Sequence, residues 1–410
     1  MNRRPITTSL LLGLALFGCN RAVTPLAPAA AGSGLAAQNV TGELLVALKP
    51  GLTRAAYGRL QADLGLQTVR RVAPLAIEVV RPRGPVAEAL QALQGRPEVR
   101  WVEANAKESL PPLRKLDAPQ TSPQRAEEGD PLRDKQWGLA KVQAPEAWAV
   151  TPGRKDVVLA IIDTGIDYNH PDLAGRVIKG RDFVNNDDDP MDGHAHGTHC
   201  AGIAGASANN GIGISGVAPG VTLMAVKVLS DQGSGSTDGV CAGIAWAADQ
   251  GAKVISLSLG GPGGKQAKQE AVDYARAKGA VVVAAMGNNG GNVAVYPGAS
   301  TGVISVGATT ADDTRASFSN FGTWITVTAP GHTILSTVPG GAYQAYSGTS
   351  MATPFVAGLA ALLRSAAPDL SEEALRQRIT SSAADLGKTG FDPQFGHGRI
   401  NVLKALSASR

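Results

Sequence analysis

Apolar runs alternate with helical patterns over the C-terminal two-thirds of the chain. Four such runs, rich in Val, Ile and Ala, lie at 156–165, 221–229, 252–261 and 280–288. Unbroken apolar runs of this length are typical of parallel strands that are covered on both faces. Helical patterns lie between or after them at 236–250, 265–278 and 349–366. We therefore predict an α/β domain over 130–410, with a mostly parallel sheet flanked by helices and ligands at the carboxyl ends of its strands.

A different pattern precedes this domain. Strand-like segments lie at 43–49, 66–72, 75–81 and 98–105, and helical spacing marks 53–65 and 85–94. The order βαββαβ is that of a ferredoxin-like module. We predict a small α+β domain over 42–105.

The remaining segments are predicted to be targeting and connecting parts. Residues 1–19 combine Arg3 and Arg4 with a short apolar stretch, which is typical of an export signal and too short for a membrane span. The ending at Cys19 fits a lipoprotein signal, so lipid attachment there and plain cleavage further on both stay open. Residues 20–41 read as an Ala/Pro/Gly-rich tether, and 106–129 as an exposed linker that a protease can cut.

Composition limits the classes of function. The chain has 410 residues, 43% of them hydrophobic, and a net charge of only +4, which does not favour a nucleic-acid partner. No segment after residue 20 is long and apolar enough to span a membrane. Beyond Cys19 only Cys200 and Cys241 remain, so the fold depends on its core rather than on disulfides. The two thiols pair or act as small buried hydrophobes, and the second reading is favoured.

Three histidines, His194, His196 and His199, stand close together at the start of a predicted helix of small residues. They suit either a zinc site or a single general base. Two other motifs bear on the choice: Asp163 ends an apolar strand, and Ser350 precedes a helix. Together the three motifs supply a nucleophile, a base and an orienting carboxylate, which acyl transfer by serine requires.

These motifs closely resemble those of the subtilisin-like serine proteases. "DTGI", "HGTH" and "GTSMATP" occur in the family's order, and "KVLSDQGSGS", "SLSLGGP" and "MGNNG" match further segments. The resemblance covers about residues 130 to 410 and is closest to thermitase-like members, while 42–105 resembles the family's inhibitor prodomain. The resemblance implies a secreted monomer that is inhibited by its own prodomain, is matured by cleavage of that prodomain, and acts on protein and peptide substrates.

The resemblance assigns roles to four residues. Asp163 orients His196, His196 accepts the proton of Ser350, and Ser350 attacks the scissile carbonyl. Asn288 supplies the side-chain amide of the oxyanion hole, beside the helix N-terminus at Ser350. A zinc hydrolase leaves Asp163 and Ser350 without a role. A non-catalytic peptide-binding relative stays open as a further alternative.

Two glycine-containing segments resemble the family's substrate-binding strands. They are Gly233, Ser234 and Gly235, and Ser258, Leu259 and Gly260. A bound peptide is expected to pair with both through main-chain hydrogen bonds. Taken alone, each segment also reads as an ordinary turn after a strand.

Carboxylates and amide oxygens predict structural Ca²⁺ at two sites. Oxygen ligands suit this ion. The first site resembles a family calcium site, with Asp172, the Asn210 side chain and the carbonyls of Ala208, Ile212 and Ile214, and with Asp130 as an N-terminal ligand. The second resembles a calcium loop of thermitase-like members and matches at Asp182, Asp187 and Asp189.

Overall fold

The computed structural model describes residues 40–110 and 129–407. The predicted signal peptide, Cys19 and most of the tether lie outside the described residues. So does most of the predicted linker. Within the described parts of the chain, no helix has the length and apolarity needed to cross a membrane.

The N-terminal module has the predicted βαββαβ order. Its elements are β1 (Val40–Leu48), α1 (Arg54–Leu64), β2 (Leu66–Val72), a 3-10 turn η1 (Ala73–Leu75), β3 (Ile77–Pro82), α2 (Val86–Leu93) and β4 (Val99–Ser109). The antiparallel strands lie in the order β2-β3-β1-β4. The two helices pack on one face, over a small core that includes Leu44, Leu60 and Leu93.

Strand β4 is longer than the sequence predicted. The linker was expected from residue 106, but β4 continues to Ser109 because its last residues pair with a strand of the following domain. That strand, β8 (Ser234–Ser236), becomes the fifth strand of the N-terminal sheet. Hydrogen bonding to a distant strand is not visible in local periodicity.

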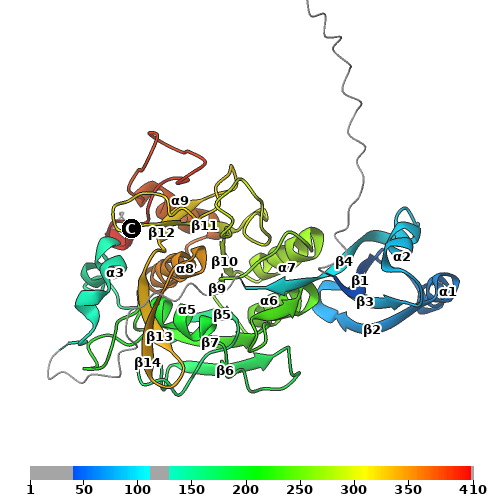
Figure 1. Ribbon diagram of the computed structural model, residues 1–410, viewed down its shortest axis with the longest axis horizontal. Coiled ribbons are helices and arrows are strands. Elements are labelled where there is room, and N and C mark those ends of the chain that lie inside the picture. The colour runs from blue at the N-terminus through cyan, green and yellow to red at the C-terminus, as the bar shows by residue number, and fades with distance from the viewer. Residues whose placement is uncertain (1–39, 111–128, 408–410) are drawn as a thin grey trace, which may run out of the picture. The chain divides into compact units, whose positions relative to one another are not determined.

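The second domain is built on seven parallel strands, as predicted (Figure 1). They are β5 (Val158–Asp163), β6 (Val177–Asp182), β7 (Thr222–Lys227), β9 (Val254–Leu257), β10 (Val281–Ala285), β11 (Ile304–Thr309) and β12 (Val327–Pro330). Their order is β12-β11-β10-β9-β5-β7-β6. The four predicted apolar runs form the centre of this sheet.

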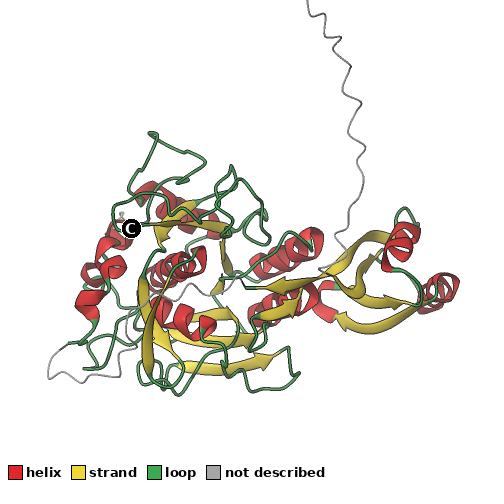
Figure 2. Ribbon diagram, in the orientation of Figure 1, coloured by secondary structure: helices red, strands yellow, loops and turns green. Residues whose placement is uncertain are grey.

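Helices cover both faces of the sheet (Figure 2). The helices are η2 (Arg133–Lys135), α3 (Trp137–Lys141), α4 (Ala144–Ala147), α5 (His196–Gly205), α6 (Thr237–Asp249), α7 (Lys265–Ala277), α8 (Thr349–Ala366), α9 (Glu372–Ser382) and α10 (Val402–Ser407). A hairpin of β13 (Ile334–Val338) and β14 (Ala342–Tyr346) precedes α8.

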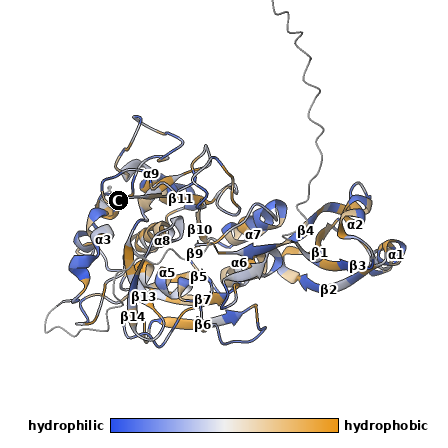
Figure 3. Cartoon of the chain, viewed as in Figure 1, coloured by the Kyte–Doolittle hydropathy of each residue, from blue (hydrophilic) through white to orange (hydrophobic). Residues whose placement is uncertain are grey.

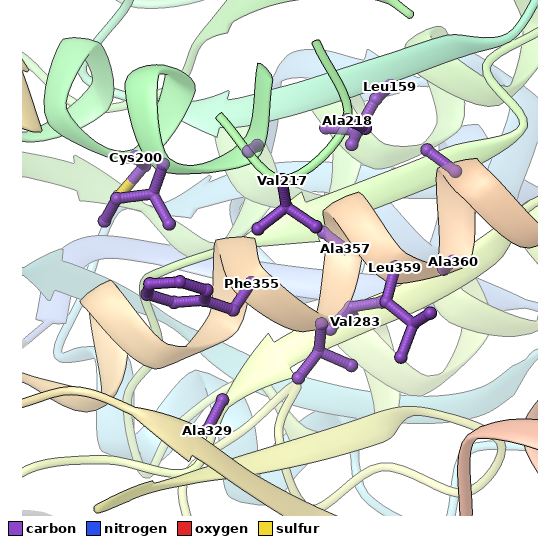
Figure 4. Packing of buried hydrophobic residues seen from close by; sticks show 14 of the residues in the cluster. Leu159, Cys200, Val217, Ala218, Val283, Ala329, Phe355, Ala357, Leu359 and Ala360 are labelled. Atoms are coloured by element: carbon purple, nitrogen blue, oxygen red, sulfur yellow. The ribbon is translucent and has the colours of Figure 1, made fainter. Parts of the chain in front are cut away.

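The apolar runs divide between two cores. In β5, Leu159 and Ile161 face α5 and α8, whereas Ala160 and Ile162 belong to the core beneath α6 and α7. Figure 4 shows the first core, where Phe355 and Leu359 of α8 lie among residues of α5 and the sheet. This explains why the strands read as continuous apolar runs. Helix α7 keeps hydrophilic residues on its outer face (Figure 3).

Candidate active site

Asp163 and His196 meet at the carboxyl edge of the sheet. Asp163 is the last residue of β5 and His196 the first of α5. Asp163 Oδ1 lies 2.7 Å from His196 Nδ1, and both side chains are buried. Helix α5 can approach this closely because its residues are small. A Cβ on Gly197 would lie 2.1 Å from the Gly165 carbonyl oxygen, so the position admits only glycine without displacement.

Electrostatics favour the charged form of this histidine. Burial by itself lowers the pKa of His196, but the adjacent Asp163 carboxylate outweighs it, and the pKa is raised well above its usual 6.5. Asp163 Oδ1 also accepts the backbone N–H of Thr164 at 2.8 Å. Its Oδ2 is buried with no hydrogen-bond partner among the described residues. The pair can therefore hold a proton on the imidazole.

Ser350 stands in the first turn of α8, close to this pair in the fold. Its Oγ donates to the Ser258 carbonyl at 2.9 Å rather than to His196. In turn the Ser258 hydroxyl donates to the Ser350 carbonyl at 2.8 Å. The backbone N–H groups of the first helical turn have no partner within the helix, which makes this end a favourable place for negative charge.

Asn288 is held at the same helix end. Its Oδ1 accepts the backbone N–H of Thr349 at 2.8 Å and the Thr349 hydroxyl at 2.9 Å. The amide nitrogen takes no part in these two hydrogen bonds. A cavity of about 390 Å³ is lined by Asn288, Ser350 and residues 258–260, so it contains one of the predicted substrate segments.

The other predicted segment is already paired with the chain itself. Glu108 of β4 opposes Gly235 in antiparallel register, and the Leu110 N–H donates to the Gly233 carbonyl at 2.8 Å. Ser109 and Leu110 also line the 390 Å³ cavity. The end of the N-terminal module thus lies in the cleft as an added strand, directed towards Ser350.

The same module contacts the helices beside the cleft. Asn105 Nδ2 donates to Asp238 of α6 at 2.7 Å, and Arg100 makes a two-pronged ion pair with Glu270 of α7 at 2.8 and 3.0 Å. The Glu103 carboxylate accepts backbone N–H groups at the start of α7. A carboxylate at a helix N-terminus is electrostatically favourable.

The three histidines do not converge on one point. His199 is buried, its Nε2 lies 3.0 Å from the Gln344 carbonyl oxygen, and its ring stacks on Tyr346. Burial lowers the pKa of His199 to about 3, so it stays neutral. His194 is half-buried. Among the described residues, the group with metal-ligand spacing is Asp163, His196 and Cys200, which is the same dyad with a nearby thiol.

Asp192 has a role that the sequence did not reveal. Its carboxylate is buried and accepts five hydrogen bonds. The donors are the Thr164 hydroxyl, the backbone N–H groups of His194 and Ala195, and both N–H and hydroxyl of Thr198. It ties the loop after β5 to the start of α5, which places Asp163 and His196 together.

The first predicted calcium site is assembled around one loop. Asp172 is buried and accepts the Asn210 side-chain amide and the Ile214 N–H, each at 2.9 Å. Asp130 accepts the backbone N–H groups of Asn209 and Asn210 at 2.8 and 3.0 Å. All these donors are neutral, and burial raises the pKa of Asp172 to about 6. Buried carboxylates with neutral partners suit a hard cation.

The second predicted site is less converged. Asp182 is buried and accepts the backbone N–H groups of Val184 and Asn185. Asp187 accepts the backbone N–H of Asp189 at 2.9 Å. In the part of the chain that the structure describes, these three carboxylates do not form a group with metal-ligand spacing.

Both remaining cysteines are buried and free. The prediction that they act as small buried residues is confirmed. Cys200 Sγ lies 4.0 Å from His196 Nδ1, behind the dyad. Burial raises the pKa of the Cys241 thiol.

Two parts of the chain match known families. Residues 154–398 match the Subtilase family, and residues 25–105 match the Fervidolysin N-terminal prodomain. The second match starts upstream of the predicted module and ends at the same residue. Each part therefore has relatives of its own.

Similar individual proteins were also found. Thermitase from Thermoactinomyces vulgaris is 49% identical over 272 residues, which is 66% of this chain and 96% of thermitase. Subtilisin E from Bacillus subtilis (strain 168) is 44% identical over 274 residues, 66% of this chain and 70% of the relative. The crystal structure of fervidolysin from Fervidobacterium pennivorans, described as a keratinolytic enzyme related to subtilisin, matches with a TM-score of 0.76 and 30% identity. That match covers 90% of this chain and 61% of fervidolysin.

Proposed function

The chain belongs to the subtilase family and is a serine endopeptidase with a fervidolysin-type prodomain; on this premise we propose that Asp163, His196 and Ser350 form its catalytic triad. The observation that carries the proposal is the buried 2.7 Å contact between Asp163 and His196 at the sheet edge. Cys200 Sγ lies 4.0 Å from His196 Nδ1 and 3.5 Å from the carbonyl oxygen of Ser350, so the pair lies beside Ser350, which lines the cleft. The substrates are proteins and peptides that bind as an added strand.

The proposed chemistry is acyl transfer. The Ser350 hydroxyl leaves the Ser258 carbonyl, turns to His196 Nε2, loses its proton there and bonds to the scissile carbonyl carbon. The Asn288 amide and the Ser350 backbone N–H stabilise the resulting oxyanion. His196 then protonates the leaving amine as the C–N bond breaks, and water releases the acyl group by the same steps in reverse order. Asp163 stays ionised and holds the imidazole in position throughout.

We propose further that residues 42–105 inhibit the peptidase and are removed by it. The support is the pairing of β4 with β8, which occupies the strand position that a substrate would need, at the edge of the cleft. The predicted linker, 106–129, overlaps the last residues of this strand, and its part beyond Ser109 supplies the chain to be cut. Export by residues 1–19, with Cys19 lipidated or discarded, also belongs to this proposal, as does action as a monomer.

Labelling with a phosphonate reagent tests the triad. The mature enzyme should take up one label, at Ser350, and lose activity in proportion. Initial activity should survive a chelator, which a zinc hydrolase built on the three histidines would not. A label on another serine, or activity that persists after complete labelling, would refute the assignment.

Calcium is proposed as a structural ion. Asp130, Asp172 and Asn210 would hold it at the first site with the carbonyls of Ala208, Ile212 and Ile214, and Asp182, Asp187 and Asp189 at the second. When bound, the ion neutralises buried carboxylates and holds these loops together. The first site has the stronger support, because its two acidic side chains are buried against neutral donors only.

A further inference from the structure

A buried ion pair joins the prodomain to the substrate cleft. Glu108 of β4 is 1% exposed, and its Oε1 lies 2.6 Å from the Nζ of Lys268, which has no exposed surface at all. The Thr237 hydroxyl donates to the same carboxylate oxygen at 2.8 Å. Glu108 and Lys268 thus meet inside the protein, at the point where β4 pairs with β8.

The peptidase domain fixes the lysine in advance. An ammonium group has three hydrogens to donate. Lys268 donates one to the Gly263 carbonyl and one to the Tyr296 carbonyl, each at 3.1 Å, and the third to Glu108. Two of the three partners therefore belong to the peptidase itself. Once the prodomain leaves, one hydrogen of a rigidly held cation points at the place of Glu108.

The pocket is shaped for a carboxylate from an extended strand. Along 107–109 of β4, Lys107 and Ser109 are exposed while Glu108 points inward, as expected from strand alternation. A Cβ on Gly261 would lie 2.8 Å from the second oxygen of Glu108, so the absence of a side chain there makes room for it. That oxygen has no hydrogen-bond partner in the described parts of the chain.

Within the described residues of the peptidase, no acidic group is paired with Lys268. Among the described residues Lys268 forms one ion pair, the pair with Glu108. The neighbouring Asp238 accepts from Ser236 of its own domain and from Asn105 and Arg70 of the prodomain, and it makes no ion pair with Lys268 in this structure. A buried cation without a counter-charge is unfavourable. A substrate carboxylate that pairs with Lys268 should therefore stabilise the complex with the mature enzyme.

We infer that Lys268 and Thr237 form an acid-selective substrate pocket, which takes the side chain of the substrate residue paired with Gly235. In the precursor, Glu108 then occupies this pocket in the way that the preferred substrate side chain would. This rests on the proposed function, since it assumes that substrates pair with β8 as the prodomain does.

Cleavage-site profiling tests the pocket directly. Mature wild-type enzyme would digest a peptide mixture, and mass spectrometry would locate every cut. We expect acidic residues, Glu above Asp, to be enriched at one position on the N-terminal side of the cut. In matched quenched peptides, Glu there should exceed Gln and Leu by about tenfold or more in kcat/KM, in keeping with desolvated charge pairs. Lys268→Met should reverse the order in favour of Leu, whereas Lys265→Met, one turn earlier on α7, should leave it unchanged.

The inference would be overturned if wild-type enzyme showed no enrichment of acidic residues, or if the enrichment persisted in Lys268→Met. A second measurement does not depend on cleavage. In the full-length Ser350→Ala chain, Glu108→Leu and Lys268→Met should each lower the melting temperature, and the double variant should lose less than the sum of the two. Additive losses would show that the pair is not coupled and would refute the pocket. An enzyme that cuts no peptide would instead refute the proposed function. The melting temperatures of the two single variants and the double variant would still test the pocket.

Discussion

His196 is the residue whose protonation is expected to set the working pH. Its pKa lies above the usual 6.5 because the Asp163 carboxylate outweighs burial. The base must be neutral, so activity falls as pH drops through this raised pKa. We expect the acid limb of the kcat/KM profile to have its midpoint above pH 6.5. Asp163→Asn should move the midpoint to lower pH and reduce the rate. A wild-type midpoint below 6.5 would contradict the assignment of His196 as the base.

Asn288 is the residue expected to act only in the transition state. Its oxygen is held by Thr349, and the residue lines the cleft beside Ser350. Asn288→Ala should lower kcat by about 10²–10³-fold with little change in KM, a range already measured for the side-chain donor of a subtilisin. Steady-state kinetics on one peptide decide the matter. A loss confined to KM would make Asn288 a ground-state contact instead.

Helix α5 depends on Asp192 for its starting position. Asp192→Ala removes the acceptor of five hydrogen bonds and leaves buried donors unpaired. We expect a loss of about 3 kcal/mol or more in the free energy of unfolding. Denaturant unfolding in the Ser350→Ala background measures it without self-digestion. Asp188→Ala, at an exposed residue of the same loop, is the control and should change stability by less than about 0.5 kcal/mol. Equal effects of the two substitutions would refute this role.

At the scale of the elements, some functional residues could be predicted from the sequence and others could not. Asp163 stands out in the sequence because it ends an apolar strand, and His196 because it opens a helix of small residues. A parallel sheet brings the carboxyl ends of its strands, and the helix starts that follow them, to one edge. Asp192 escaped notice since its neighbours are acidic and its partners are backbone groups. Glu108 and Lys268 escaped notice because they are 160 positions apart by number and meet only when β4 pairs with β8. Contacts made by pairing between domains leave no local signal.

At the scale of the whole molecule, calcium is expected to hold the peptidase domain together without taking part in proton transfer. A ligand that binds only the folded state adds about 4 kcal/mol of stability at a thousandfold excess over Kd. Chelation should therefore lower the melting temperature and speed self-digestion before it alters initial turnover at low temperature. Asp172→Ala should flatten the calcium dependence of stability, and Asp187→Ala should do so through the other site. An immediate loss of turnover at an unchanged melting temperature would point to a catalytic metal.

The central claim is that this chain is a serine endopeptidase that removes its own prodomain through Ser350. Intact-mass spectrometry of purified full-length protein, followed over time and free of other proteases, tests it most directly. Wild type and Ser350→Ala should both fold, but only wild type should convert to a prodomain and a mature chain, cut after β4 and before the peptidase domain. Ser347→Ala, three residues away in the same segment, should mature like wild type. A Ser350→Ala chain that matured at the wild-type rate would contradict the account.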